Sequence, residues 1–186
     1  VTRTLNRLTQ GSAPGTAEMR YKSDYLGRME EITYPDKEVV TYDYDSGGQV
    51  TSVKGQRLGV TTTYIEKIGY DEFGQRTYIR YDNDVETTYE YDENRRWLKT
   101  LQSTNQIGNN IQNINYSFDD VGNIIKLDND SDLYRTNKTY VYDDLYQLTE
   151  VIGLFESRPT GSLDYKSSYN QNFTFDSIGN IQRKDS

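Results

Sequence analysis

The sequence of 186 residues contains no cysteine, no histidine and only three prolines. Without Cys and His the chain cannot form a thiolate nucleophile, an imidazole base, a Ser-His-Asp triad or a thiolate or imidazole zinc site. No apolar run approaches the roughly 20 residues of a membrane helix, the longest being 151–155, so we expect no membrane insertion. These absences exclude a large part of enzymology, and we expect no cofactor.

Basic residues are the minority, since 21 Lys and Arg against 29 Asp and Glu give a net charge of −8. Nucleic acid is therefore disfavoured as a partner, because phosphates need a basic face. Only 33% of the residues are hydrophobic, which is typical of disordered chains, but 13% are aromatic, which is not. The 18 Tyr and 14 Gly favour strands and turns. Val1 is not an initiator Met and no signal peptide is present, so we expect the chain to begin as a mature piece or as an expressed segment.

A short motif recurs through the chain: an aromatic residue, Asp, two variable residues and Gly. Four copies are complete, one lacks the leading aromatic, and two have Arg95 or Tyr146 where the others have Gly. Successive Asp residues lie 21 to 33 residues apart, so we expect a fixed unit joined by loops of varying length. The Asp and Gly positions are Asp24/Gly27, Asp45/Gly48, Asp71/Gly74, Asp92, Asp119/Gly122, Asp143 and Asp176/Gly179.

Each unit has the pattern of a β-hairpin. Before the Asp, aromatic or aliphatic residues alternate with others, and period two places them on one face of a strand. Asp bonds turn amides and Gly accepts a positive φ, so these residues are assigned a structural role in turns, and Arg95 and Tyr146 should mark turns of altered geometry. Because a single hairpin cannot bury its face, we expect an all-β array of consecutive antiparallel hairpins that forms a curved sheet.

The aromatic pairs before the Asp are expected to lie on one side of the sheet, to contact the pair of the next repeat and to supply the core. These pairs are Tyr42/Tyr44, Tyr89/Tyr91, Tyr116/Phe118, Tyr140/Tyr142 and Phe173/Phe175.

Residues 1–20 are interpreted as a remnant of a preceding repeat and a linker. Residues 21–186 are interpreted as about seven repeats, with a longer loop at 153–170. The terminal strands of such an array have unpaired edges, so we expect edge-to-edge association or cover by residues 10–20 or 153–170.

The unit Tyr-Asp-x-x-Gly, followed by Asn, Arg or Gln and then by Leu, Ile or Val, resembles the Rhs or YD-repeat family. Its members include Rhs polymorphic toxins, the cocoon-forming components of Tc insecticidal toxins, wall-associated proteins and teneurins. The resemblance covers Asp24 to Ser186, and 118–124 and 175–181 match best. It implies a β-spiral that closes as a hollow shell and that encloses a C-terminal toxin in bacterial members. Segment 140–148 resembles a variant repeat that precedes the Rhs core, so we expect the C-terminal part of a repeat region.

The resemblance implies a non-catalytic scaffold, a fragment of the YD-repeat shell of a secreted or cell-surface protein, most simply bacterial. Its partners would be neighbouring repeats of the parent protein, and an enclosed C-terminal toxin or a glycan. The family's autoproteolytic element is built around Asp-Pro-x-Gly, and the chain has no Asp-Pro pair, so that activity is not expected.

Two other functions are open at this point. A carbohydrate-binding module would stack exposed aromatics on sugar rings, and Trp97 is the candidate glycan-stacking residue because it is unique. A glycosidase would need two carboxyls roughly 5–10 Å apart, but Asp at a recurring turn position is better explained by bonds to backbone amides.

Two acidic segments have the spacing of metal ligands. Residues 128–132 (Asp-Asn-Asp-Ser-Asp) place oxygen ligands at positions 1, 3 and 5 of a calcium loop, but Leu133 and Thr139 stand where Gly and Glu are required. We therefore interpret this segment, and also 82–84 (Asp-Asn-Asp), as polar hairpin tips and expect no metal site.

Overall fold

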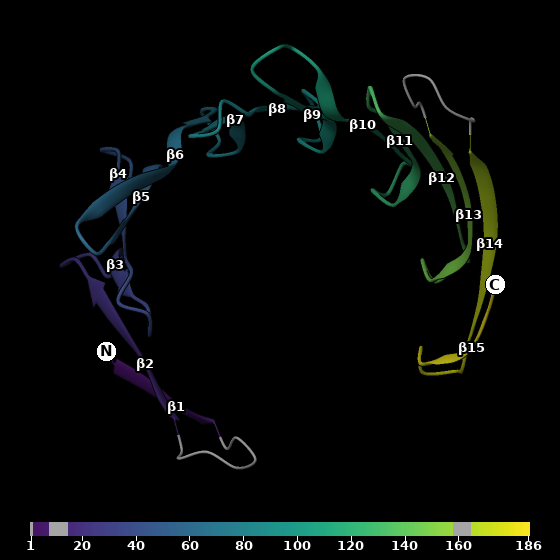
Figure 1. Ribbon diagram of the computed structural model, residues 1–186. Helices are drawn as coiled ribbons and strands as arrows, with labels where there is room; N and C mark the ends of the chain where they lie inside the picture. The colour runs from purple at the N-terminus through teal and green to yellow at the C-terminus, as the bar shows by residue number, and fades with distance from the viewer. Residues whose placement is uncertain (1, 8–14, 158–164) are drawn as a thin grey trace. The chain divides into compact units, whose positions relative to one another are not determined.

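The computed structural model describes residues 2–7, 15–157 and 165–186, and within these ranges it contains strands and turns but no helix. It accordingly has no helix that could cross a membrane in the part of the chain described. The chain divides into two compact units, residues 1–84 and 85–186, and in each unit every strand pairs antiparallel with the next to form a curved sheet (Figure 1). The expected all-β array of consecutive hairpins is confirmed.

The first unit contains β1 (Thr2–Arg7), β2 (Gly15–Ser23), β3 (Met29–Thr33), β4 (Val39–Tyr44), β5 (Val50–Arg57), β6 (Val60–Tyr70) and β7 (Arg76–Tyr81). The second contains β8 (Glu86–Tyr91), β9 (Leu98–Thr104), β10 (Asn110–Phe118), β11 (Ile124–Asp130), β12 (Tyr134–Tyr142), β13 (Leu148–Ser157), β14 (Lys166–Phe175) and β15 (Ile181–Asp185).

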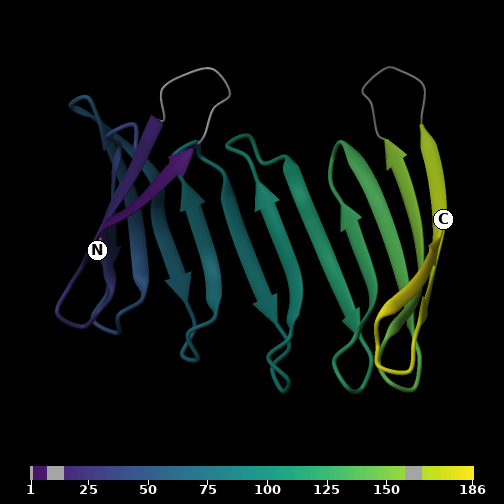
Figure 2. The same ribbon diagram turned by 90° about the horizontal axis from the view of Figure 1, so that it is seen from below.

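The Asp units form every second turn of each sheet. In the second unit they connect β8 to β9, β10 to β11, β12 to β13 and β14 to β15. The turns therefore all lie at the same end of the strands, and this side of the sheet, formed by turns and not by an outermost strand, is here called the Asp edge (Figure 2). The pairing register shifts beside the aromatic that precedes each Asp, for example at Phe118 and Tyr142. A β-bulge therefore accompanies the turn in each repeat of this unit.

The two faces of the second sheet differ in chemistry. Cross-strand register places Tyr89, Leu101, Ile114, Asn129 and Phe155 on one face, here called the aromatic face. The pairs Tyr89/Tyr91, Tyr116/Phe118, Tyr140/Tyr142 and Phe173/Phe175 share that face, as expected from period two. The opposite, polar face presents a row with Gln102, Asn113, Arg135, Glu156 and Lys166.

The core is thin. The buried apolar side chains are Val40 and Ile79 in the first unit and Ile114 and Val151 in the second, whereas the paired rings are half-buried. A tyrosine ring covers a glycine of the sheet: a Cβ on Gly153 would overlap the ring of Tyr169. The sheet is thus covered largely by its own aromatic side chains.

The expected loop over 153–170 is largely wrong. β13 continues to Ser157 and β14 begins at Lys166, and only 158–164 lie outside the described residues. The sequence of β13 does not alternate between apolar and polar residues, so period two did not predict this strand. Val151 lies on the aromatic face, but Ile152 and Leu154, on the partly exposed polar face, are apolar too. Residues 1–20 include β1 and the first part of β2, and the expected cover by residues 10–14 lies outside the described residues.

Candidate functional site

The repeated Asp turn is built around one carboxylate oxygen that accepts two backbone N–H groups. In the turn at Asp119, the amides of Val121 and Asn123 donate to Oδ1 at 3.1 and 2.8 Å. The Asp119 amide donates to the carbonyl of Asn123 at 3.0 Å and closes the loop. The same pair of amide bonds is made at Asp24, Asp71, Asp143 and Asp176.

In three turns, those at Asp24, Asp119 and Asp176, the polar side chain after the Gly position binds the second carboxylate oxygen. Arg28 Nε donates to Asp24 Oδ2 at 2.7 Å, and the side-chain Nδ2 of Asn180 donates to Asp176 Oδ2 at 2.9 Å. The Asn180 side chain, followed by backbone amides, lowers the pKa of Asp176 below its usual range. A lowered pKa keeps the carboxylate ionised, which suits a turn and is the opposite of what a general acid requires.

In three repeats the tyrosine before the Asp binds the preceding repeat. The hydroxyls of Tyr44, Tyr70 and Tyr142 donate to the carbonyls of Met29, Val50 and Ile124 at 2.6, 2.9 and 2.8 Å. Each acceptor is the first residue of the return strand one repeat earlier, beside the bulge. In these repeats the Tyr-Asp dipeptide has two structural roles: the Asp carboxylate accepts hydrogen bonds within its own turn, and the Tyr hydroxyl donates a hydrogen bond to the preceding repeat.

The residue after the Gly position also covers the Gly of the next turn. A Cβ on Gly122 would lie 2.9 Å from Cζ2 of Trp97, and one on Gly74 would lie 2.9 Å from Nε2 of Gln49. Gly122 in addition has a φ of 99°, in the left-handed region that favours glycine. The other predicted turn glycines also have a positive φ: 81° at Gly27, 83° at Gly48, 79° at Gly74 and 87° at Gly179.

The two variant turns differ from each other. Tyr146 takes the Gly position with a φ of 61° and keeps the ordinary bonds of the Asp143 turn. The Asp92 turn is one residue longer, because the Asp92 amide donates to the carbonyl of Trp97 at 2.8 Å. The left-handed residue there is Arg96, with a φ of 61°, and not Arg95. The altered geometry expected for this turn is present, but its left-handed residue lies one position after Arg95.

Trp97 is packed against its own chain. Its ring centroid lies 5.1 Å from that of Phe118, and the guanidinium carbon of Arg95 lies 4.8 Å from the Trp97 ring centroid. These side chains line a cleft of about 360 Å³ together with Asp92, Lys99, Tyr116 and Asp120. The half-buried indole is therefore a contact between two repeats, and these contacts do not favour the interpretation of Trp97 as a sugar-stacking platform.

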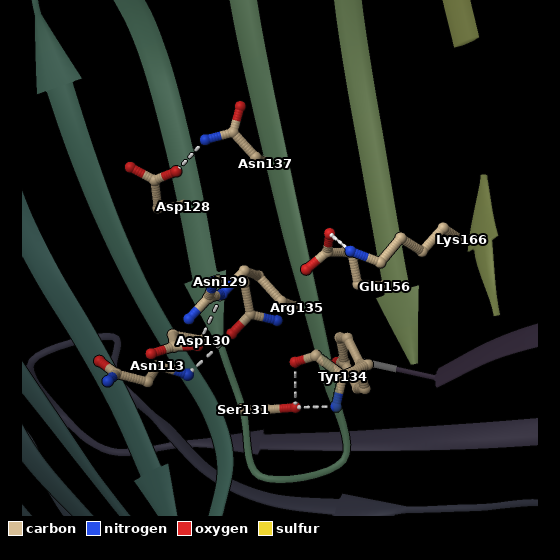
Figure 3. A network of polar contacts seen from close by, with 10 residues as sticks. All are labelled: Asn113, Asp128, Asn129, Asp130, Ser131, Tyr134, Arg135, Asn137, Glu156 and Lys166. Atoms are coloured by element: carbon tan, nitrogen blue, oxygen red, sulfur yellow. Dashed lines mark hydrogen bonds and ion pairs between the residues drawn. The ribbon is translucent and has the colours of Figure 1, made fainter. Parts of the chain in front are cut away.

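The acidic segment 128–132 does not form a metal loop. Asp128 and Asp130 lie within β11 and bind Asn137 and Arg135 of β12, the latter pair at 3.1 Å (Figure 3). The backbone amide of Asn110 donates to Oδ2 of Asp132 at 2.7 Å. The described residues contain no group of three acidic side chains that could hold a metal ion. Only 131–133 form the hairpin tip, so the expected tip was too long.

The second acidic segment, 82–84, follows the end of β7. Asp84 has a φ of 58°, and its carboxylate lies 3.1 Å from Arg80 Nη2. This carboxylate therefore forms an ion pair beside a turn, in agreement with the interpretation as a polar tip.

The motif did not predict the turn at Asn105, which connects β9 to β10 on the side of the sheet opposite the Asp edge and has the same hydrogen bonds. The amides of Ile107 and Asn109 donate to Oδ1 of Asn105 at 3.2 and 2.9 Å, and Gly108 has a φ of 83°. The search required an aromatic residue and Asp before the Gly, whereas Asn supplies the same acceptor oxygen. A search for Asx followed by Gly three residues later finds this turn.

No family model matches the chain. Two curated proteins of Yersinia entomophaga are similar in sequence: the toxin subunit YenC1, 25% identical over 94% of this chain, and the toxin subunit YenC2, 28% identical over 75% of it. The chain spans 20% and 17% of their lengths.

The fold occurs in solved structures of Tc toxin components. Over 98% of this chain, TcdB2-TccC3 in its crystal structure with Cdc42 has a TM-score of 0.79 at 23% identity. The Photorhabdus luminescens Tc holotoxin pore has a TM-score of 0.78 at 22% identity. The chain covers 10% of each of those chains. The resemblance of the chain to the Rhs/YD-repeat family, which includes Tc toxin subunits, is thus confirmed by its sequence relatives and by its fold.

Proposed function

We propose that the chain is a non-catalytic section of the shell of a Tc-toxin-like subunit secreted by a bacterium. The observation that carries this proposal is the use of the motif side chains. Asp119 and Asp176 hold their own turns, Tyr70 and Tyr142 bind the preceding repeat, and Trp97 covers the following one. Motif residues engaged in this way serve to build a continuous wall.

The chemistry of the carboxylates supports a structural role. In the turns at Asp92 and Asp176 the pKa of the carboxyl is lowered, by the Arg95 backbone amide in the first and by the Asn180 side chain in the second. Neither carboxylate is prepared to donate a proton near neutral pH, which a glycosidase acid must do. The carbohydrate-binding alternative gains no support from the contacts of Trp97.

The partners in this proposal are the repeats before and after the chain in its parent protein. The parent's shell would enclose a C-terminal effector, as the family resemblance implies. The pairing of consecutive strands supports this role, because a sheet built in this order can be extended by adding further hairpins.

A chimera tests the proposal. The matched stretch of YenC1 is replaced by this chain, and the soluble yield and protease resistance of the whole subunit are compared with those of YenC1. A matched control chimera carries Tyr70→Phe and Tyr142→Phe, which remove two bonds between repeats. We expect the first chimera to be soluble and to protect the C-terminal part of the subunit, and the control to protect it less.

Two results would contradict the scaffold role. One is a soluble first chimera whose C-terminal part is cleaved as fast as that of a denatured sample. The other is retention or hydrolysis of an oligosaccharide by the isolated 186-residue chain, measured on a glycan array and by reducing-end assay.

A further inference from the structure

The repeat at Asp92 departs from the other repeats at two positions. The residue after the left-handed position is Trp97 here, whereas it is polar in each of the other six repeats. Lys99, two residues further on, is the only basic residue at its position among the seven repeats. A repeat that departs from its own pattern is a place where a function beyond the building of the sheet is expected.

Both residues line the cleft of about 360 Å³ at the Asp92 turn. The wall of this cleft is aromatic, because Trp97 packs on Phe118 with ring centroids 5.1 Å apart and Tyr116 stacks on Phe118 at 6.4 Å. A cleft of this volume, with apolar walls and a few polar groups, is typical of a site for a small ligand.

A β-bulge brings Lys99 to this cleft. In the pairing of β8 with β9, Tyr91 lies opposite Leu98 and Glu90 lies opposite Thr100, so Lys99 is the extra residue of the bulge. Bulges re-aim side chains and are frequent beside functional sites. Lys99 accordingly has no cross-strand partner in β8, and its side chain lines the aromatic cleft.

The charged groups around the cleft have partners, with one exception. The carboxylate of Asp92 accepts the amides of Asn94 and Arg95 at 3.0 and 2.6 Å. The carboxylate of Asp120 lies 3.4 Å from Arg95 Nη2. The charge of Lys99 contributes to the lowered pKa of Asp92, of which the Arg95 backbone amide is the main cause. Even so, the Lys99 ammonium has no hydrogen bond or ion pair in the part of the chain that the structure describes, so one cation is open to an anion.

The hydroxyl of Tyr116 is a second open donor. The hydroxyl of Tyr142 binds a backbone carbonyl, whereas that of Tyr116 has no hydrogen-bond partner among the described residues. Burial raises the pKa of Tyr116, so the hydroxyl keeps its proton at neutral pH and can donate. An ammonium and a hydroxyl beside three rings match a carboxylate that is attached to an aromatic group.

We propose that this cleft binds a small monocarboxylate with an aromatic body. The carboxylate accepts hydrogen bonds from Lys99 and Tyr116, and the aromatic body packs on Phe118. A second carboxylate is disfavoured, because Lys99 also borders a neighbouring cleft that is lined by Glu90 and Glu93. This inference concerns a ligand of the chain itself and is independent of the scaffold role.

The single tryptophan of the chain makes this site directly observable, because selectively excited emission comes from Trp97 alone. The probe is N-acetylphenylalanine, its uncharged counterpart is N-acetylphenylalanine amide, and phenylsuccinate carries two carboxylates. Titrations of the 186-residue chain are followed by this emission and by isothermal titration calorimetry. Lys99→Gln removes the cation. Lys126→Gln, at an exposed lysine of β11 outside the cleft, is the matched control, and circular dichroism shows that both variants are folded.

We expect N-acetylphenylalanine to bind the unchanged chain with a Kd of about 1 mM, which is usual for a ligand of this size. Removing the charge from the ligand, or from the chain by Lys99→Gln, should weaken binding roughly tenfold, because a charge-assisted hydrogen bond is lost. Lys126→Gln should bind the probe as the unchanged chain does, and phenylsuccinate should bind more weakly than the probe. The absence of a saturable signal in both measurements, equal binding of the acid and the amide, undiminished binding by Lys99→Gln, or binding of phenylsuccinate as tight as that of the probe would each overturn the proposal.

Discussion

At the scale of the residue, the tyrosine before the Asp forms a hydrogen bond to the preceding repeat in three of the repeats, in addition to packing. The bulge beside the turn leaves a carbonyl that the hydroxyl of Tyr70 or Tyr142 binds from the next repeat. An unmet buried carbonyl costs more than an ordinary hydrogen bond gains, so this contact makes Tyr preferable to Phe. The sequence predicted an aromatic at this place, but the acceptor could be recognised only when the repeats were placed side by side.

Tyr142→Phe should lower the free energy of unfolding by about 1 kcal/mol, the usual contribution of one hydrogen bond. Tyr140→Phe, in the same pair, is the matched control, because the bond to Ile124 is made by Tyr142. Urea unfolding followed by circular dichroism measures both. Equal losses in the two variants would show that the bond to Ile124 contributes nothing specific.

The carboxylates of the turns predict a dependence on acid. The pKa of Asp176 is lowered in the folded chain by the Asn180 side chain, so its contribution to stability is present above the unfolded pKa of about 3.9 and is lost as the pH falls through the folded value. Asp176→Asn should keep the turn, since Asn105 makes the same amide bonds, and should reduce the loss of stability between pH 7 and pH 3. Asp176→Ala should lower the unfolding midpoint already at pH 7. Unfolding curves at the two pH values check both, and an Asn variant as acid-sensitive as the unchanged chain would contradict the assignment.

Phe118 tests how much a half-buried ring contributes. It packs on Trp97 and on Tyr116, with ring centroids 5.1 and 6.4 Å apart. The loss for a fully buried Phe is 3–5 kcal/mol, so we expect about 2 kcal/mol for Phe118→Ala. Thermal and urea unfolding measure it, and a loss near zero would mean that the aromatic face is not the core.

At the scale of the element, the hairpin is the part that the sequence predicted best. The Asp of the motif located the seven turns, five of them together with the Gly, and alternation predicted which side the aromatic pairs take. Prediction failed where the local chemistry departs from the motif. The Asp92 turn contains an extra residue, so its left-handed residue is Arg96 and not Arg95. The strand 148–157 has apolar residues on both faces, so period two did not predict it. The Asn105 turn was missed because an amide oxygen can replace a carboxylate.

Glycine can be required in the motif for two reasons, a positive φ or a lack of space for a Cβ, and two of the motif glycines allow these to be measured separately. Gly27 and Gly122 both have a positive φ, but a Cβ on Gly27 would meet nothing within 4 Å, whereas one on Gly122 would meet Trp97. Gly27→Ala should cost about 1 kcal/mol from the backbone conformation alone, and Gly122→Ala should cost more. Combining Gly122→Ala with Trp97→Ala should recover the excess, because it removes the clash. Urea unfolding of the four variants gives the coupling, and additive losses would refute the contact.

At the scale of the whole molecule, each strand that the structure describes pairs with its neighbours in sequence. Hydrogen bonds from Tyr44, Tyr70 and Tyr142 each span one repeat, and no long-range layer covers either described sheet. Stability is then a sum of hairpin and interface contributions, so it differs along the chain. The end strands of such an array are its weakest places, because each has a neighbouring strand on one side where an inner strand has two.

Hydrogen exchange should reveal this gradient within the second unit. β15 is exposed at all five residues and pairs only with β14, whereas β13 contains the buried Val151 and Gly153 and pairs on both sides. At a concentration where the chain is monomeric, we expect the amides of β15 to exchange fastest and those of β12 and β13 slowest, because opening an end strand disrupts one interface and opening an inner strand disrupts two. Mass spectrometry of peptic fragments measures the order. Uniform exchange across β12 to β15 would show that the unit opens as one cooperative body and would contradict coupling by neighbours alone.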